Sequence, residues 1–97
     1  MKVRFAQEAR NEFAEAARWY AVHAGAGQAT AFRNEILRIL RLLADHPDMG
    51  TPDVGGCRRM TAHRFPYTVV YRHEPGSLRI IAIAHQHRRP EYWVGRR

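Results

Sequence analysis

The spacing of apolar residues changes once along this chain, and the change limits the folds that the chain can adopt. Between residues 9 and 43 the apolar residues recur at steps of three and four, which is typical of amphipathic helices. From residue 57 to residue 84 they alternate or form short β-branched runs, which is typical of strands. Because the helical segments precede the strands, the sequence predicts an α+β fold with a helical hairpin packed on one face of a small antiparallel β-sheet. A short run at residues 3–5 predicts an additional N-terminal strand.

Two helices are predicted, joined by a turn at residues 25–27 in which Gly25 is expected to adopt a positive φ. The apolar stripe of the first helix consists of Ala9, Phe13, Ala16, Tyr20 and Ala24. Its expected solvent side carries Glu8, Glu12, Glu15 and Arg18. The second helix begins near Gln28 and is expected to bury Phe32, Ile36, Ile39, Leu40 and Leu43. The expected surface ion pairs are Glu35 with Arg38 and Arg41 with Asp45.

The strands follow a loop at residues 46–56, which contains two prolines and three glycines. A first strand is predicted within residues 57–65. The segments 67–71 and 78–84 are joined by a Pro-Gly turn and predict a β-hairpin. In the expected register Tyr71 faces Ile80 and Tyr67 faces Ala84. One apolar face would then cover the helices, although a slip of one residue would exchange the two faces.

The composition restricts the chain to a few classes of protein. Residues 1–97 are expected to form a single domain, and the one cysteine, Cys57, excludes an internal disulfide. No apolar segment is long enough to span a bilayer, so a cytoplasmic protein is expected. Residues 1–56 are neutral overall, whereas residues 57–97 contain nine arginines against two glutamates and carry the whole net charge of +7. Such asymmetry favours an acidic or polyanionic partner.

The stretch AHQHRRPEYW at residues 84–93 has three possible meanings: an active site, a docking surface for an acidic partner, or a strand end with a basic tail. His85 and His87 would project to one side, but further metal ligands are missing and two arginines follow, so no metal site is expected. Histidines and arginines could together support acid–base cleavage of RNA. Trp93 is expected to fold back and close the core, and Arg96 and Arg97 are expected to be mobile.

Three segments together resemble the RelE/ParE superfamily of toxins from type II toxin–antitoxin systems. They are EFAEAARWY (12–20), RFPYTVVYR (64–72) and IAIAHQHRRPEYW (81–93). The resemblance covers nearly the whole chain and implies the α+β toxin fold described above. One branch of the superfamily cuts mRNA on the ribosome, and the ParE branch is described as inhibiting DNA gyrase without known catalytic residues.

The residues favour the ParE branch. Where the ribonucleases commonly carry a phosphate-contacting arginine, this chain has Thr68, which would weaken transition-state stabilisation. The resemblance therefore implies a gyrase inhibitor that needs no cofactor. In the alternative, an endoribonuclease acting on mRNA and the ribosome, the catalytic residues would be His85, His87, Arg88 and Tyr92. A nucleic-acid-binding module without toxicity is a third possibility.

Both branches share one partner, a cognate antitoxin that wraps the toxin with an acidic or amphipathic segment. The expected antitoxin-binding residues are Phe13, Trp19, Tyr20, Phe32, Arg58 and Arg59. The expected target-binding residues are Arg64, Arg72, Arg79, His87, Arg88, Arg89, Tyr92 and Trp93. A short neighbouring gene with an acidic C-terminal half would support this class.

Overall fold

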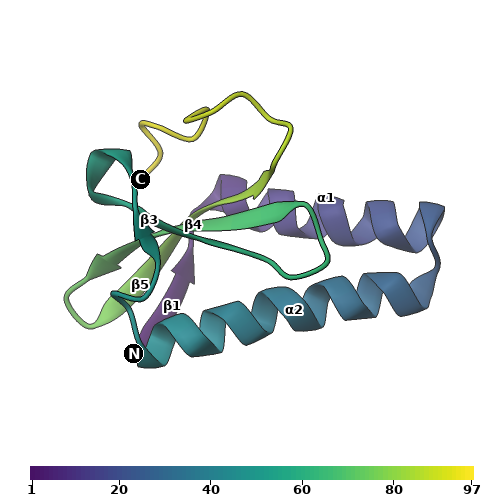
Figure 1. The fold of residues 1–97 in the computed structure, drawn as a ribbon, viewed down its shortest axis with the longest axis horizontal. Helices are drawn as coiled ribbons and strands as arrows, with labels where there is room; N and C mark the ends of the chain where they lie inside the picture. Colours follow the sequence, from purple (N-terminus) through teal and green to yellow (C-terminus); the bar gives the residue numbers. More distant parts are fainter.

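Two antiparallel helices form one layer of the molecule in the computed structural model, which describes all residues 1–97. Helix α1 spans Gln7–His23 and helix α2 spans Ala26–Asp45, with Gly25 between them at φ 95° as predicted. The sheet lies on one face of this hairpin, and the C-terminal segment crosses the opposite face of the sheet (Figure 1). Neither helix combines the length and apolar composition needed to cross a membrane.

The sheet contains five strands in the order β1-β5-β4-β3-β2. Their bounds are Lys2–Phe5 (β1), Thr51–Pro52 (β2), Arg58–Thr61 (β3), Tyr67–Glu74 (β4) and Ser77–His85 (β5), and a single 3₁₀ turn, Val54–Gly56, precedes β3. All neighbours are antiparallel except β1, which lies parallel to β5. The predicted α+β fold is confirmed, but the N-terminal strand makes the sheet mixed.

The main core fills the space between the helices and the sheet. Its helical side comes from the predicted stripes, and Phe32, Ile36, Ile39 and Leu43 are fully buried. Val69, Tyr71, Leu78 and Ile80 cover it from the sheet. The expected pair of Glu35 with Arg38 forms at 2.7 Å, whereas Arg41 and Asp45 make no ion pair.

The expected register of the β4–β5 hairpin is correct at the turn and wrong beyond it. Tyr71 faces Ile80 as predicted, but Val70 then faces Ala82, so Ile81 is an extra residue in β5. This β-bulge shifts every later pair by one position, and Tyr67 faces His85 instead of Ala84. Ile83 consequently packs toward the helices, while Ala82 and Ala84 face the other side.

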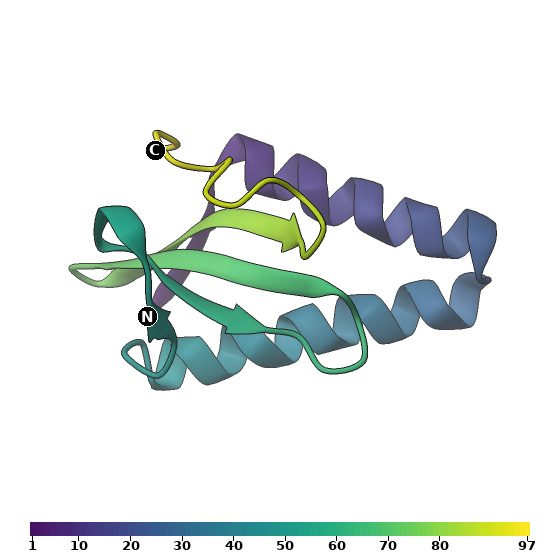
Figure 2. The same cartoon turned by 45° about the horizontal axis from the view of Figure 1, so that its top comes forward.

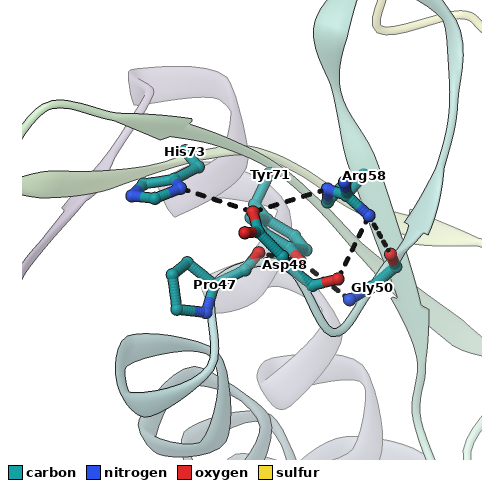
Figure 3. A network of polar contacts seen from close by, with 6 residues as sticks. All are labelled: Pro47, Asp48, Gly50, Arg58, Tyr71 and His73. Atoms are coloured by element: carbon teal, nitrogen blue, oxygen red, sulfur yellow. Dashed lines mark hydrogen bonds and ion pairs between the residues drawn. The ribbon is translucent and has the colours of Figure 1, made fainter.

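The long loop after α2 is held against the sheet by Tyr71 (Figure 3). The Tyr71 hydroxyl donates to the carbonyl of Pro47 at 2.6 Å and accepts from the amide of Gly50 at 2.9 Å. Arg58 donates to the carbonyls of Asp48 and Gly50. Tyr71 therefore joins the loop to the core, and burial raises the pKa of its phenol.

Candidate functional site

The C-terminal segment, residues 86–97, returns across the outer face of the sheet and covers a second apolar cluster. Trp93 is only 6% exposed and packs with Cys57, Val70, Ile81 and other small apolar residues of this face. The predicted folding back of Trp93 is confirmed. However, it covers the outer face of the sheet instead of closing the end of the main core.

Glu12 on α1 fixes this segment in place. Its carboxylate accepts hydrogen bonds from the Tyr92 hydroxyl at 2.6 Å and from the Arg96 guanidinium at 2.9 and 3.1 Å. It also accepts from the main-chain amide of Ile83 at 3.0 Å, beyond the point where β1 stops pairing with β5. Figure 2 shows the C-terminal segment beside the first turns of α1, as these contacts require.

Two sequence-based predictions fail at this point. Glu12 was expected in solvent, and Arg96 was expected to be mobile, yet their side chains are only 14% and 15% exposed. The position of Glu12 offered a signal, because Ala9 and Ala16, three residues before and four after it, are both buried. Glu12 thus lies at the border of the buried stripe, where a carboxylate can reach the sheet edge.

Tyr92 lies between two guanidinium groups as well as against Glu12. The Arg88 and Arg96 guanidinium carbons lie 3.9 and 5.0 Å from the centre of its ring, within the range of cation–π attraction. Burial and the hydrogen bond to Glu12 raise the pKa of Tyr92 well above its ordinary value of 10.0. The phenol therefore stays protonated at neutral pH and is committed to a structural contact.

His85 and His87 lie together at the end of β5. Their ring centres are 5.1 Å apart, and the main-chain amide of His87 donates to Nδ1 of His85 at 3.0 Å. His85 is half-buried with its ring against Tyr67, whereas His87 is exposed. The structure contains no group of three or more His, Cys, Asp or Glu side chains that could hold a metal ion.

The predicted target-binding residues do not form one surface. His87 belongs to the C-terminal segment, as do Arg88, Arg89, Tyr92 and Trp93, and these last four line a pocket together with Asp53, Arg59 and Thr68. Arg72 and Arg79 lie at the opposite end of the sheet, next to the β4–β5 turn. Arg64 is exposed in the loop before β4, with its guanidinium carbon 6.0 Å from the Phe65 ring centre.

The predicted antitoxin-binding residues are also divided. Phe32 is fully buried among Phe13, Tyr20 and Phe65, so its side chain is not on the surface that a partner would meet. Arg58 and Arg59 lie on β3, where Arg59 pairs with Asp53 at 3.2 Å. Trp19 is 54% exposed on α1 and stacks on His23.

A solvent-facing groove, which we call the helix groove, begins beside Phe13. Ala14, Ala17 and Ala21 form its floor with Phe13, and Arg10, Arg18 and Arg33 form its rim. Short side chains on α1 leave this groove open, because alanine does not fill the space between the two helices. An apolar floor with a cationic rim suits an amphipathic, acidic segment.

Comparison with known proteins identifies the class to which this fold and basic surface belong, the toxins of type II toxin–antitoxin systems. The family model described as the ParE toxin of type II toxin-antitoxin system, parDE, matches residues 3–90. The chain belongs to this ParE toxin family, whose members pair with a cognate antitoxin.

A solved structure supports the fold. A chain of the chromosomal ParDE TA system from P. aeruginosa aligns with a TM-score of 0.74 and 20% sequence identity. The alignment covers 88% of the present chain and 95% of that chain. No curated protein sequence matches.

Proposed function

We propose that this chain is a cytoplasmic toxin that inhibits DNA gyrase without catalysing a reaction and is neutralised by its cognate antitoxin. The observation that carries the proposal is the match to the ParE toxin family over residues 3–90. The +7 charge of the chain is consistent with an acidic antitoxin or with a target bound to DNA.

The contacts of the C-terminal side chains favour a non-catalytic toxin. The Tyr92 hydroxyl donates a hydrogen bond to Glu12, and Thr68 stands where the ribonuclease branch commonly has an arginine. Glu12 and Glu15 line a hollow beside His85 and Arg88, and the carboxylate of Glu15, which has no ion pair, would repel a scissile phosphate. Of the groups nominated for catalysis, Tyr92 instead holds the segment to α1.

Ribonuclease activity is the second candidate, because His85 and His87 lie 5.1 Å apart beside Arg88. Two adjacent imidazoles could act as base and acid in RNA cleavage. His87 is the one exposed histidine of this pair, so it is the residue on which this alternative depends.

Induction of the protein in bacterial cells separates the two candidates. Gyrase inhibition predicts a DNA damage response and filamentation with intact mRNA, and purified protein should block supercoiling by purified gyrase. Cleaved mRNA together with native supercoiling would overturn the gyrase proposal. His87→Ala should remain toxic, whereas loss of toxicity in a folded His87→Ala variant would favour the ribonuclease.

The helix groove is the proposed docking site of the antitoxin, since its floor is apolar and its three arginines complement an acidic segment. Ala14→Glu adds a carboxylate to the floor, so this variant should stay toxic and escape neutralisation by the co-expressed antitoxin. Ala26→Glu places the same charge on the exposed first turn of α2 as a control. Equal neutralisation of both variants would exclude the helix groove.

A further inference from the structure

Three arginines lie side by side on neighbouring strands, at the end of the sheet where the β4–β5 turn lies. Arg4 of β1 faces Arg79 of β5, and Arg79 faces Arg72 of β4. Their sequence neighbours Phe5, Ile80 and Tyr71 pack toward the helices, so alternation places all three arginines on the outer face. Because adjacent strands are about 4.8 Å apart, the row extends for roughly 10 Å. We call Arg4, Arg72 and Arg79 the arginine row.

The arginine row is poorly neutralised by the protein itself. Arg4 and Arg79 form no ion pair with an acidic side chain, and neither do the nearby Lys2 and Arg97. Glu74 is the single acidic side chain in the surrounding hollow, and it lies 3.6 Å from Arg72 with both side chains about one-third exposed. Like charges directly opposite each other destabilise a sheet, so this arrangement opposes folding. Local arrangements that oppose folding are expected mainly at functional sites.

Two contacts with the C-terminal segment orient the guanidinium groups. Arg79 donates to the main-chain oxygen of Arg97 at 2.7 Å, and Arg72 donates to that of Arg96 at 3.3 Å. A guanidinium has five N–H donors, so most donors in the row remain open to a ligand. The C-terminal segment therefore holds the row in position.

The chemistry of the hollow selects the ligand. It is lined by charged and small residues around the β4–β5 turn, with no large apolar side chain. A protein partner would require apolar or aromatic anchors, and a single-stranded nucleic acid would require aromatic rings for stacking. Arginine forks bind phosphate oxygens in pairs, and a row of them matches the regularly spaced phosphates of a duplex. We propose that the arginine row, with Lys2, binds the phosphate backbone of duplex DNA without reading its sequence.

This activity is separate from gyrase inhibition and is tested without a topoisomerase. Binding of the purified chain to a labelled DNA duplex of about 25 base pairs is measured as a function of salt concentration. Arg4→Gln/Arg72→Gln/Arg79→Gln should reduce the slope of log affinity against log salt by about 2 to 3, because each lost phosphate contact lowers it by about 0.9. The affinity should fall about tenfold or more at moderate salt.

A matched control distinguishes binding by the arginine row from general attraction between a basic protein and DNA. Arg10→Gln/Arg18→Gln/Arg33→Gln removes the same charge from the helix groove and should change the slope much less. Lys2→Gln/Arg4→Gln leaves the contacts with Arg96 and Arg97 intact, and should still reduce the slope by about 2 even if the triple variant loosens the C-terminal segment. Equal effects of the row and the helix-groove variants, or no binding by the parent chain, would overturn the proposal.

Discussion

Glu12 is the residue that joins the first helix to the C-terminal segment, and its loss should be costly. Glu12→Gln retains the shape of the side chain but leaves Arg96 without its carboxylate in a largely buried site. We expect a loss of about 2–4 kcal/mol in the free energy of unfolding, measured by urea denaturation. Glu15→Gln, an exposed change one turn away, should stay within about 0.5 kcal/mol of the parent. Equal losses in both variants would contradict the role of Glu12.

Glu35 should make the free energy of unfolding depend on pH in the acid range. Its hydrogen bond to Arg38 lowers the pKa of this carboxyl below its ordinary value of 4.5, and the amide of His63 also donates to it at 2.6 Å. A lowered folded-state pKa means that the contribution is present above pH 4.5 and is lost as the pH falls through the folded-state value.

Unfolding measured between neutral pH and pH 3 checks this dependence. Arg38→Gln should flatten the acid limb of the stability profile. Arg41→Gln, an arginine of the same helix without an ion pair, serves as the charge-matched control and should keep the parent profile. An unchanged acid limb in Arg38→Gln would exclude this pair as its source.

At the scale of the element, the loop between α2 and β3 depends on one glycine. A Cβ atom at Gly50 would lie 2.6 Å from the Tyr71 hydroxyl and 2.9 Å from the carbonyl of Arg59, which cannot yield easily. Gly50→Ala should therefore destabilise the protein by about 1–3 kcal/mol in urea unfolding. Gly27→Ala has open space in α2 and should be neutral or stabilising by up to about 1 kcal/mol. Similar values for the two variants would show that the loop yields freely.

The sequence predicted the elements of this fold better than their register. Hydrophobic periodicity located both helices and the β4–β5 hairpin, because each period reflects a buried face. The extra residue at Ile81 was not predictable, because residues 80–84 of β5 read as a continuous apolar run and no glycine or polar residue marks the bulge.

The candidate site was less predictable for a related reason. Trp93 was correctly expected to fold back, but two of its partners, Ala82 and Ala84, lie on the outer face only because the bulge turns them outward. The Glu12 contacts join residues more than 70 positions apart, and local patterns carry no information about such pairs. The arginine row likewise depends on the parallel pairing of β1 with β5, which periodicity alone does not reveal.

At the scale of the whole molecule, the two tryptophans should behave in opposite ways. Trp93 is buried in the outer cluster, so Trp93→Ala should cost about 3–5 kcal/mol and release the C-terminal segment. Trp19 is exposed on α1, so Trp19→Ala should change stability by less than about 1 kcal/mol. Thermal and urea unfolding of both variants test this difference. A small loss in Trp93→Ala would mean that the outer cluster adds little to the fold.

The pairing of the first strand with the last has a consequence for the order of folding. The helical hairpin and the β4–β5 hairpin form from local contacts, whereas β1 must meet residues 77–80 across nearly the whole chain. Closing so long a loop is entropically unfavourable until both hairpins have associated, so β1 should dock after the rate-limiting step. Val3→Ala should then accelerate unfolding and leave the refolding rate almost unchanged in stopped-flow experiments. Slower refolding at constant unfolding rate would instead place β1 in the folding nucleus.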